Sequence, residues 1–282
     1  MPNLADQATE LRRLAGGEPD RWAGGPPRHV AVLAGKPGAG ATTFAVNLAA
    51  AAAQSGRRAL LVDADPICGD AAAACGVRSA FGLGEVLSSE CELADAVVSS
   101  AAGVDVVCGG VALGTRFRRP AFAAGLIEQV QSLDELPDIV YWDCGCGPHD
   151  WLSRVLREAD LALVTTADSI SLLETYAAIK VYGRRGGRSI SVAANRCPED
   201  GRRCGWDAYQ RLQRAAWRHL QVSVAWGGEF PLDEQIQLTA IQGLPLAHQN
   251  PTSTTGQALR RWSDDMISSQ SRRDRRGGLR QG

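Results

Sequence analysis

Short apolar runs alternate along most of the chain with longer segments whose apolar residues recur at helical spacing. The runs predict strands at 29–34, 59–63, 104–108, 138–142, 160–166, 189–195 and 221–226. The segments between and after them predict helices at 42–54, 120–131, 150–157, 171–182 and 205–219, a short helix from Asp233 and a last helix from about 257. Almost continuously apolar strands are typical of parallel sheets covered on both faces. The pattern therefore predicts an α/β fold: a doubly wound, mostly parallel sheet flanked by helices.

The two ends of the chain differ from this regular part, which we assign to residues 28–256 as one domain. Residues 1–15 predict a short amphipathic helix, and the Gly- and Pro-rich residues 16–27 predict a flexible linker. Residues 257–282 predict an amphipathic helix with an apolar stripe, followed by an Arg-rich tail that we expect to be disordered. The stripe consists of Leu259, Trp262 and Met266. It fits either an anionic membrane surface or packing on the chain's own domain.

Composition narrows the class of protein. Hydrophobic residues make up 45% of the 282 residues, enough for a sizeable core, and the formal net charge is −1. Because the charges are mixed outside the Arg-rich tail, we expect no specific nucleic-acid partner. No signal-like or membrane-spanning apolar run is present, which predicts a cytoplasmic protein. We expect the eight cysteines to be reduced and not to bind metal, since Cys144 and Cys146 lack a common zinc spacing.

A glycine-rich loop follows the first predicted strand and leads directly into a helix. Backbone N–H groups in such a loop cradle phosphate oxygens, and the helix N-terminus adds partial positive charge. Thr42 stands where a hydroxyl can ligate Mg²⁺. An ordinary Gly-rich turn is the alternative. The nucleotide-binding candidates are Gly35, Lys36, Gly38, Ala39, Gly40, Ala41, Thr42 and Thr43.

Acidic residues come at the ends of two predicted strands. Asp63 ends the strand at 59–63 and Asp65 lies two residues after it, whereas Asp143 follows the strand at 138–142. Open α/β sheets bind ligands at the carboxyl ends of their strands, and carboxylates there can hold Mg²⁺. The sequence therefore predicts a Mg²⁺ site made by Thr42, Asp63 and Asp143, although aspartates that form ordinary turns remain the alternative for Asp63 and Asp65.

The loop resembles the deviant phosphate loop of the ParA/MinD family, whose pattern is K-G-G-x-G-K-[ST]. Lys36 matches the first lysine of that pattern, whereas Pro37 replaces a glycine and Ala41 replaces the second lysine. The resemblance implies binding of ATP with Mg²⁺ between two protomers of an ATP-dependent homodimer. It also implies catalytic roles for Lys36, which would act on the partner's phosphates, and for Asp65, which would position water. The absence of the second lysine predicts a weak or absent ATPase.

Three further positions match the adenine side of the same family. Asn195 and Arg196 match an N-R pair that reads the base, and Pro231 lies in a segment resembling the I-P-x-D loop around it. The resemblance implies that these residues bind adenine. An asparagine at the end of a strand is more often a turn residue. The assignment of Asn195 to adenine binding therefore depends on its position in the order of the family's motifs.

The N-terminal segment indicates the subfamily. Residues 6–12 match the D-Q-A-x-x-L-R element of the FlhG family of flagellar-number regulators. The resemblance implies that Asp6, Gln7, Leu11 and Arg12 contact an FlhF-type GTPase and stimulate it, with Gln7 as the active group. It also implies transient contact between residues 257–282 and an anionic membrane surface. A helix that packs on its own domain is the alternative for the N-terminal element.

Other functions remain open at this level. The chain could be a pseudo-ATPase scaffold, or a ParA/MinD relative that positions septa, chromosomes or pili. An iron–sulfur relative of the same fold is a third possibility, disfavoured because the sequence has no C-x-x-C pair.

Overall fold

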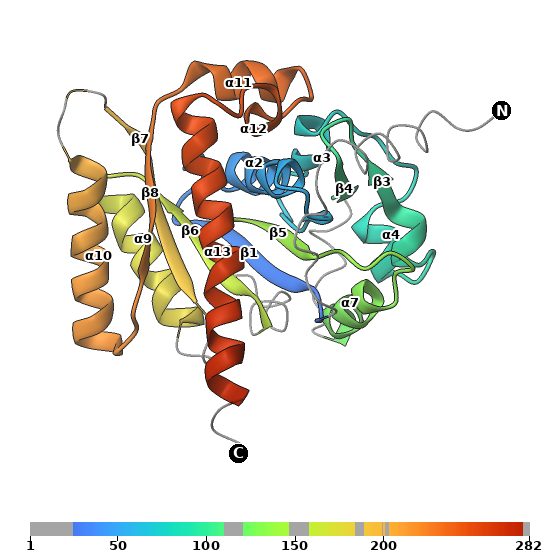
Figure 1. Cartoon of the computed structure of the whole chain (residues 1–282), viewed down its shortest axis with the longest axis horizontal. Coiled ribbons are helices and arrows are strands. Elements are labelled where there is room, and N and C mark those ends of the chain that lie inside the picture. The colour runs from blue at the N-terminus through green and yellow to red at the C-terminus, as the bar shows by residue number, and fades with distance from the viewer. Residues whose placement is uncertain are drawn as a thin grey trace.

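The computed structural model describes residues 25–109, 121–146, 158–183, 189–198, 200 and 203–278, with the backbone alone at 121–124 and 269–278. Its centre is an eight-stranded sheet in the order β3-β4-β2-β5-β1-β6-β7-β8 (Figure 1). All neighbouring strands are parallel except β3 and β4, which are antiparallel. The strands are β1 Arg28–Ala34, β2 Ala59–Asp63, β3 Val97–Ser99, β4 Val104–Val107, β5 Ile139–Cys146, β6 Asp160–Thr165, β7 Ile190–Cys197 and β8 Ala225–Pro231. This confirms the predicted doubly wound, mostly parallel fold.

Helices cover both faces of the sheet (Figure 1). Alternate residues of β1 point to opposite cores: Val30 and Val32 pack beneath α2 and α13, whereas Ala31 and Leu33 belong to the core that includes α7, α9 and α10. The helices are α2 Ala41–Gln54, α3 Ala71–Ala74, α4 Leu83–Leu87, α5 Leu93–Ala96, α7 Ala121–Gln131, α9 Ser169–Tyr182, α10 Cys204–Leu220, α11 Glu234–Ile241, α12 Leu246–Gln249 and α13 Thr254–Gly278.

The predicted strand at 221–226 is wrong in its position. Helix α10 runs to Leu220, and the paired strand β8 begins only at Ala225 and continues through two glycines. The glycines are needed there, because a Cβ atom on Gly227 would lie 2.6 Å from the ring of Trp262. Glycine weakens a strand locally, so this segment lacks the apolar pattern that predicts one.

Helix α13 corrects the expected end of the ordered region. Its backbone is helical to Gly278, well into the Arg-rich segment expected to be disordered. Arginine is a good helix former, and a helix already docked on the domain extends at low cost. Residues 1–24 lie outside the described residues, as do the predicted helix at 150–157 and residues 279–282 of the tail.

The apolar stripe of α13 is part of the core. Leu259, Trp262 and Met266 are 1%, 2% and 5% exposed. The indole N–H of Trp262 donates to Ser191 Oγ at 3.1 Å, and its ring packs edge-on against Phe44, with 5.5 Å between centroids. In this conformation the stripe binds the chain's own domain. No helix among the described residues is long and apolar enough to span a bilayer.

Candidate nucleotide site

The glycine-rich loop leaves the sheet at β1, one of its central strands, and enters α2 at Ala41. The Gly35 N–H donates to Val164 O at 3.1 Å, which ties the start of the loop to β6. The loop then turns back on itself, with the Ala39 N–H donating to Lys36 O at 3.2 Å. Gly40 has φ +114° and precedes the first turn of α2. The predicted order of strand, loop and helix is therefore present.

Two glycines are required by close packing around this loop. A Cβ atom on Gly35 would overlap Thr175 Oγ1 and lie 2.6 Å from Ser171 O, both on α9. A Cβ atom on Gly40 would lie 2.7 Å from Asn195 Nδ2, and its positive φ is a further reason for glycine. The loop is thus held between α9 and the end of β7.

Ala41 lies in an apolar setting at the first position of α2. It is buried with Ala34 and Ala39, and Cys146 packs against the three of them. The family pattern has its second lysine at this position. Lys36 and Lys180 are the only lysines in the sequence, so Lys36 is the one lysine that the loop carries.

Lys36 forms an ion pair within the same chain. Its Nζ lies 2.8 Å from Asp168 Oδ2, and both side chains are partly exposed. Asp168 is the N-cap of α9, where Oδ1 accepts from the Ser171 N–H at 3.1 Å. The hydrogen bond from Lys36 is the main reason why the pKa of Asp168 is lowered from its usual value. Sequence reasoning missed Asp168, although an aspartate directly before a predicted helix is a recognisable cap.

Asp63 and Asp143 lie side by side at the centre of the sheet. They are register partners on β2 and β5, and both are fully buried. Burial is the main cause that raises the pKa of Asp63 to about 8, and the charge of Asp143 adds to it. Burial likewise raises the pKa of Asp143 to about 7, opposed by the Thr42 hydroxyl. Asp143 was expected to follow its strand, but β5 includes Asp143 and continues to Cys146, which pairs with Ala34 of β1.

This pair has the features of a cation site. Asp143 Oδ1 accepts from the Gly145 N–H at 3.1 Å. Asp143 Oδ2 is buried and has no hydrogen-bond partner within the described part of the chain. A buried carboxylate oxygen without a partner is costly unless a proton or a cation neutralises it. Oxygen donors are what Mg²⁺ prefers, so Asp63, Asp143 and the Thr42 hydroxyl fit this ion.

Asp65 reaches the same region from the loop after β2. Its Oδ1 accepts from the Ile67 N–H at 2.8 Å, and its backbone N–H donates to Asp63 Oδ1 at 3.4 Å. A Cβ atom on Gly145 would overlap the Asp65 carboxylate, so Asp65 packs directly on the last part of β5. The structure therefore brings all three predicted acidic residues together.

The predicted adenine-side residues lie next to the loop. Asn195 Nδ2 donates to Ala39 O at 2.8 Å, and its Oδ1 accepts from the Arg196 N–H at 2.9 Å. The Asn195 amide thus binds the loop itself in this conformation, and β7 extends past it to Cys197. Pro231 ends β8 opposite Cys197. The predicted partner-binding residues Asp6, Gln7, Leu11 and Arg12 lie outside the described residues.

Comparison with known proteins agrees with this geometry. A family model described as an AAA domain matches residues 27–170. The antiactivator FleN of Pseudomonas aeruginosa is 31% identical over 219 residues, which cover 75% of this chain and 76% of FleN. An uncharacterized ATP-binding protein of Methanocaldococcus jannaschii is 28% identical over 232 residues, covering 82% of this chain and 84% of that protein. The septum site-determining protein MinD from Pyrococcus horikoshii, solved with Mg-ADP, superposes with a TM-score of 0.71 at 22% identity, covering 85% of this chain and 95% of MinD.

A parallel sheet with a phosphate loop after a central strand and carboxylates beside it defines a P-loop protein. Within that class, the chain belongs to the AAA-domain family as a ParA/MinD-type member close to FleN and FlhG.

Proposed function

We propose that the chain binds ATP with Mg²⁺ at this site and acts as a FlhG-like regulator of flagellar number or placement. The observation that carries the nucleotide proposal is the buried Asp63–Asp143 pair, with its partnerless oxygen, beside a glycine loop that opens a helix. A relative whose name states ATP binding, and another solved with Mg-ADP, support the same ligand.

In this proposal each part of the site has a separate task. The backbone N–H groups from Gly38 to Thr43 hold the phosphates, and the N-terminus of α2 adds partial positive charge. Thr42, Asp63 and Asp143 hold the metal. Bound Mg²⁺ would neutralise charge on the phosphates. Asp65 would orient a water molecule, as its place beside Gly145 permits.

On the base side, Asn195 would release Ala39 O and turn its amide toward the adenine, with Arg196 and Pro231 beside it. That exchange replaces one hydrogen bond with another, so its net cost is small.

Hydrolysis should be slow, because Ala41 provides no ammonium group to stabilise the transition state. Removal of one such electrostatic contact lowers rates by about 10²–10³. Lys36 is the remaining lysine of the loop, and we propose that it leaves Asp168 and contacts the phosphates of a second protomer. The ion pair is partly exposed, so breaking it costs at most about 1 kcal/mol.

Exposed apolar residues on both sides of the site support ATP-dependent self-association. Ile67 lies two residues after Asp65 and is 73% exposed, and Ile170 lies two residues after Asp168 and is 67% exposed. Large exposed apolar side chains next to a ligand site often mark an interface. We expect Ile170→Glu to prevent dimer formation with Mg-ATP in analytical ultracentrifugation. Leu238→Glu, a change at an exposed apolar residue of α11, is the matched control and should not prevent it.

The regulatory part of the proposal depends on residues 6–12. We expect the full chain to accelerate GTP hydrolysis by an FlhF-type GTPase, and Gln7→Ala to remove that acceleration because the active amide is lost. Thr9→Ala, at a variable position of the same element, is the control and should retain it. If Gln7→Ala accelerates the GTPase as well as the unmodified chain does, this part of the proposal is wrong.

The similarity to MinD favours one alternative function, that of an ATPase that positions septa, chromosomes or pili. That role predicts no effect on an FlhF-type GTPase. Contact with anionic membranes, in either role, would require another surface of α13 or release of its buried stripe. Vesicle co-sedimentation with and without Mg-ATP tests that contact.

A further inference from the structure

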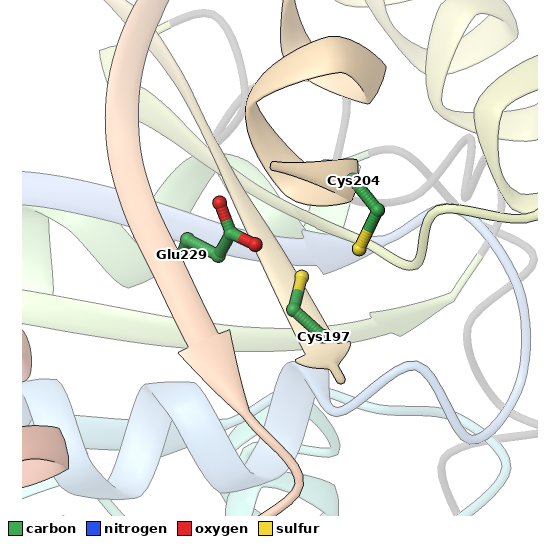
Figure 2. A group of neighbouring side chains, drawn as sticks. All are labelled: Cys197, Cys204 and Glu229. Atoms are coloured by element: carbon green, nitrogen blue, oxygen red, sulfur yellow. The ribbon is translucent and has the colours of Figure 1, made fainter. Parts of the chain in front are cut away.

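Two thiols and a carboxylate converge outside the nucleotide site. Cys197 ends β7, Cys204 begins α10, and Glu229 lies on β8 (Figure 2). Their sulfur and carboxylate oxygen atoms all lie within 4.8 Å of one another, and the three side chains point toward a common centre (Figure 2). Residues from three different elements are thus directed at one small volume.

Gly205 lies against this group and leaves room for it. A Cβ atom on Gly205 would lie 2.8 Å from both Cys197 Sγ and Glu229 Cδ. The Gly205 N–H donates to Glu229 Oε1 at 3.3 Å, which orients the carboxylate. Cys197 is buried, whereas Cys204 and Glu229 are partly exposed, so the group can be reached from solvent. The three side chains therefore surround a small space, and the Glu229 carboxylate is already oriented toward it.

We propose that Cys197, Cys204 and Glu229 bind a thiophilic divalent cation of the Zn²⁺ type. Two thiolates favour Zn²⁺ over Mg²⁺ or Ca²⁺, which prefer oxygen ligands. In a tetrahedral zinc site with bonds of about 2.3 Å to sulfur, the two sulfur atoms are about 3.8 Å apart. The ligand atoms lie within 4.8 Å of one another, so the two sulfur atoms need to approach by no more than about 1 Å. Three protein ligands leave a fourth position for water or another small ligand.

The chemistry of the ligands explains why a cation would suit this place. Burial, with a contribution from the Glu229 charge, raises the pKa of the Cys197 thiol far above its usual value. Binding of the cation would displace the thiol protons, and the resulting thiolates and the carboxylate would all be attracted to the cation.

The location indicates what the cation would do. Cys197 lies two residues after Asn195, and Glu229 lies two residues before Pro231, so two ligands adjoin the proposed base side of the nucleotide site. A bound cation would fasten the ends of β7 and β8 to the start of α10. The prediction from sequence that no cysteine binds metal considered only short spacings, whereas these two are seven positions apart and the third ligand comes from another strand.

Cobalt titration of the reduced full-length protein tests the proposal, since Co²⁺ replaces Zn²⁺ and reports thiolate ligation by near-ultraviolet charge-transfer absorption. We expect one equivalent of Co²⁺ to produce these bands and equimolar Zn²⁺ to remove them. Cys197→Ser and Cys204→Ser should each lose at least half of the absorption. Cys91→Ser is the control: it changes a partly buried cysteine near the opposite edge of the sheet and should leave the spectrum unchanged.

The Glu229→Gln variant distinguishes the contribution of the carboxylate to metal binding from that of the thiols. It should keep the charge-transfer bands but weaken Co²⁺ affinity by more than about tenfold, since even an outer-shell contact contributes about 10–100-fold. Circular dichroism of each variant checks that it is folded. Absence of thiolate bands in the unmodified, reduced protein would overturn the proposal, as would bands that persist unchanged in a folded Cys204→Ser variant.

Discussion

The two halves of the proposed nucleotide site differ in how many of the expected functional groups they contain. On the acidic half, Asp63, Asp65 and Asp143 lie together, buried and close to Thr42. On the phosphate-loop half, the backbone path is present, but Ala41 is buried among small apolar residues and Lys36 is paired with Asp168.

This difference separates binding from turnover. Backbone N–H groups and a metal site are sufficient to hold a nucleotide. Fast phosphoryl transfer needs positive charge placed where charge develops in the transition state. We therefore expect the chain to bind ATP more readily than it hydrolyses ATP.

Restoring a lysine at position 41 of the phosphate loop should change activity more than any other substitution considered below. We expect Ala41→Lys to raise the rate of phosphate release by about 10²–10³, because an ammonium group would again stabilise the transition state. Ala41→Met is the matched control, since it introduces a chain of similar length into the same buried position without charge. A rate that rises equally in both variants, or in neither, would contradict the assignment of Ala41 as the defect.

Removing the charge of Asp143 should weaken nucleotide binding and stabilise the metal-free fold. We expect Asp143→Asn to abolish the Mg²⁺-dependent part of nucleotide affinity. The same change should raise the free energy of unfolding of the metal-free protein by about 1–3 kcal/mol at pH 8, because it removes a buried negative charge that lies beside the Asp63 carboxylate. Calorimetric binding and urea denaturation measure the two effects. Weaker binding together with a less stable metal-free fold would indicate a purely structural role.

The raised pKa values predict a pH dependence with a definite sign. With pKa values of about 8 for Asp63 and about 7 for Asp143, against 3.8 in the unfolded chain, the metal-free folded state binds more protons than the unfolded state. Their contribution to stability is therefore present at low pH and is lost as the pH rises from about 4 to about 8. Because Mg²⁺ competes with these protons, its stabilising shift of Tm should grow between pH 6 and pH 8. A shift that is independent of pH in this range would contradict the pairing of these carboxylates around the ion.

Releasing Lys36 should give the smallest effect. Asp168→Asn keeps a good N-cap for α9 but removes the charge that holds Lys36. Since the pair is partly exposed, we expect the free energy of unfolding to change by less than about 1 kcal/mol and nucleotide affinity to rise by no more than a few-fold. Thermal denaturation and calorimetry measure both, with Asp138→Asn, at an ion pair with Arg58 elsewhere, as the control.

Most of the sheet was predictable because its strands are buried on both faces and so are apolar throughout. The strands predicted at 29–34 and 59–63 match β1 and β2 to within one residue at either end. The three-residue strand β3 was not predicted, because so short an edge strand has too few residues to show a period. Strand β8 was misplaced because its glycines serve contact with Trp262, a residue far along the chain.

The site was predictable where motifs are local. The loop, the hydroxyl and the carboxylates follow one another in the sequence in a recognisable order, and Thr42, Asp63 and Asp143 are neighbours in the structure. Contacts between residues far apart in the sequence were not predictable in the same way. Neither the ion pair of Lys36 with Asp168 nor the hydrogen bond of Asn195 to Ala39 O follows from the spacing of residues in the sequence. The convergence of Cys197, Cys204 and Glu229 likewise depends on how three elements pack.

The proposal that the chain binds ATP but hydrolyses it slowly is tested by calorimetric titration of the full chain with ATP, with and without Mg²⁺, alongside a phosphate-release assay. We expect saturable, Mg²⁺-dependent binding of a single nucleotide per chain, with phosphate release far slower than in the Ala41→Lys variant. No saturable heat with Mg-ATP, or hydrolysis by the unmodified chain as fast as by that variant, would contradict it.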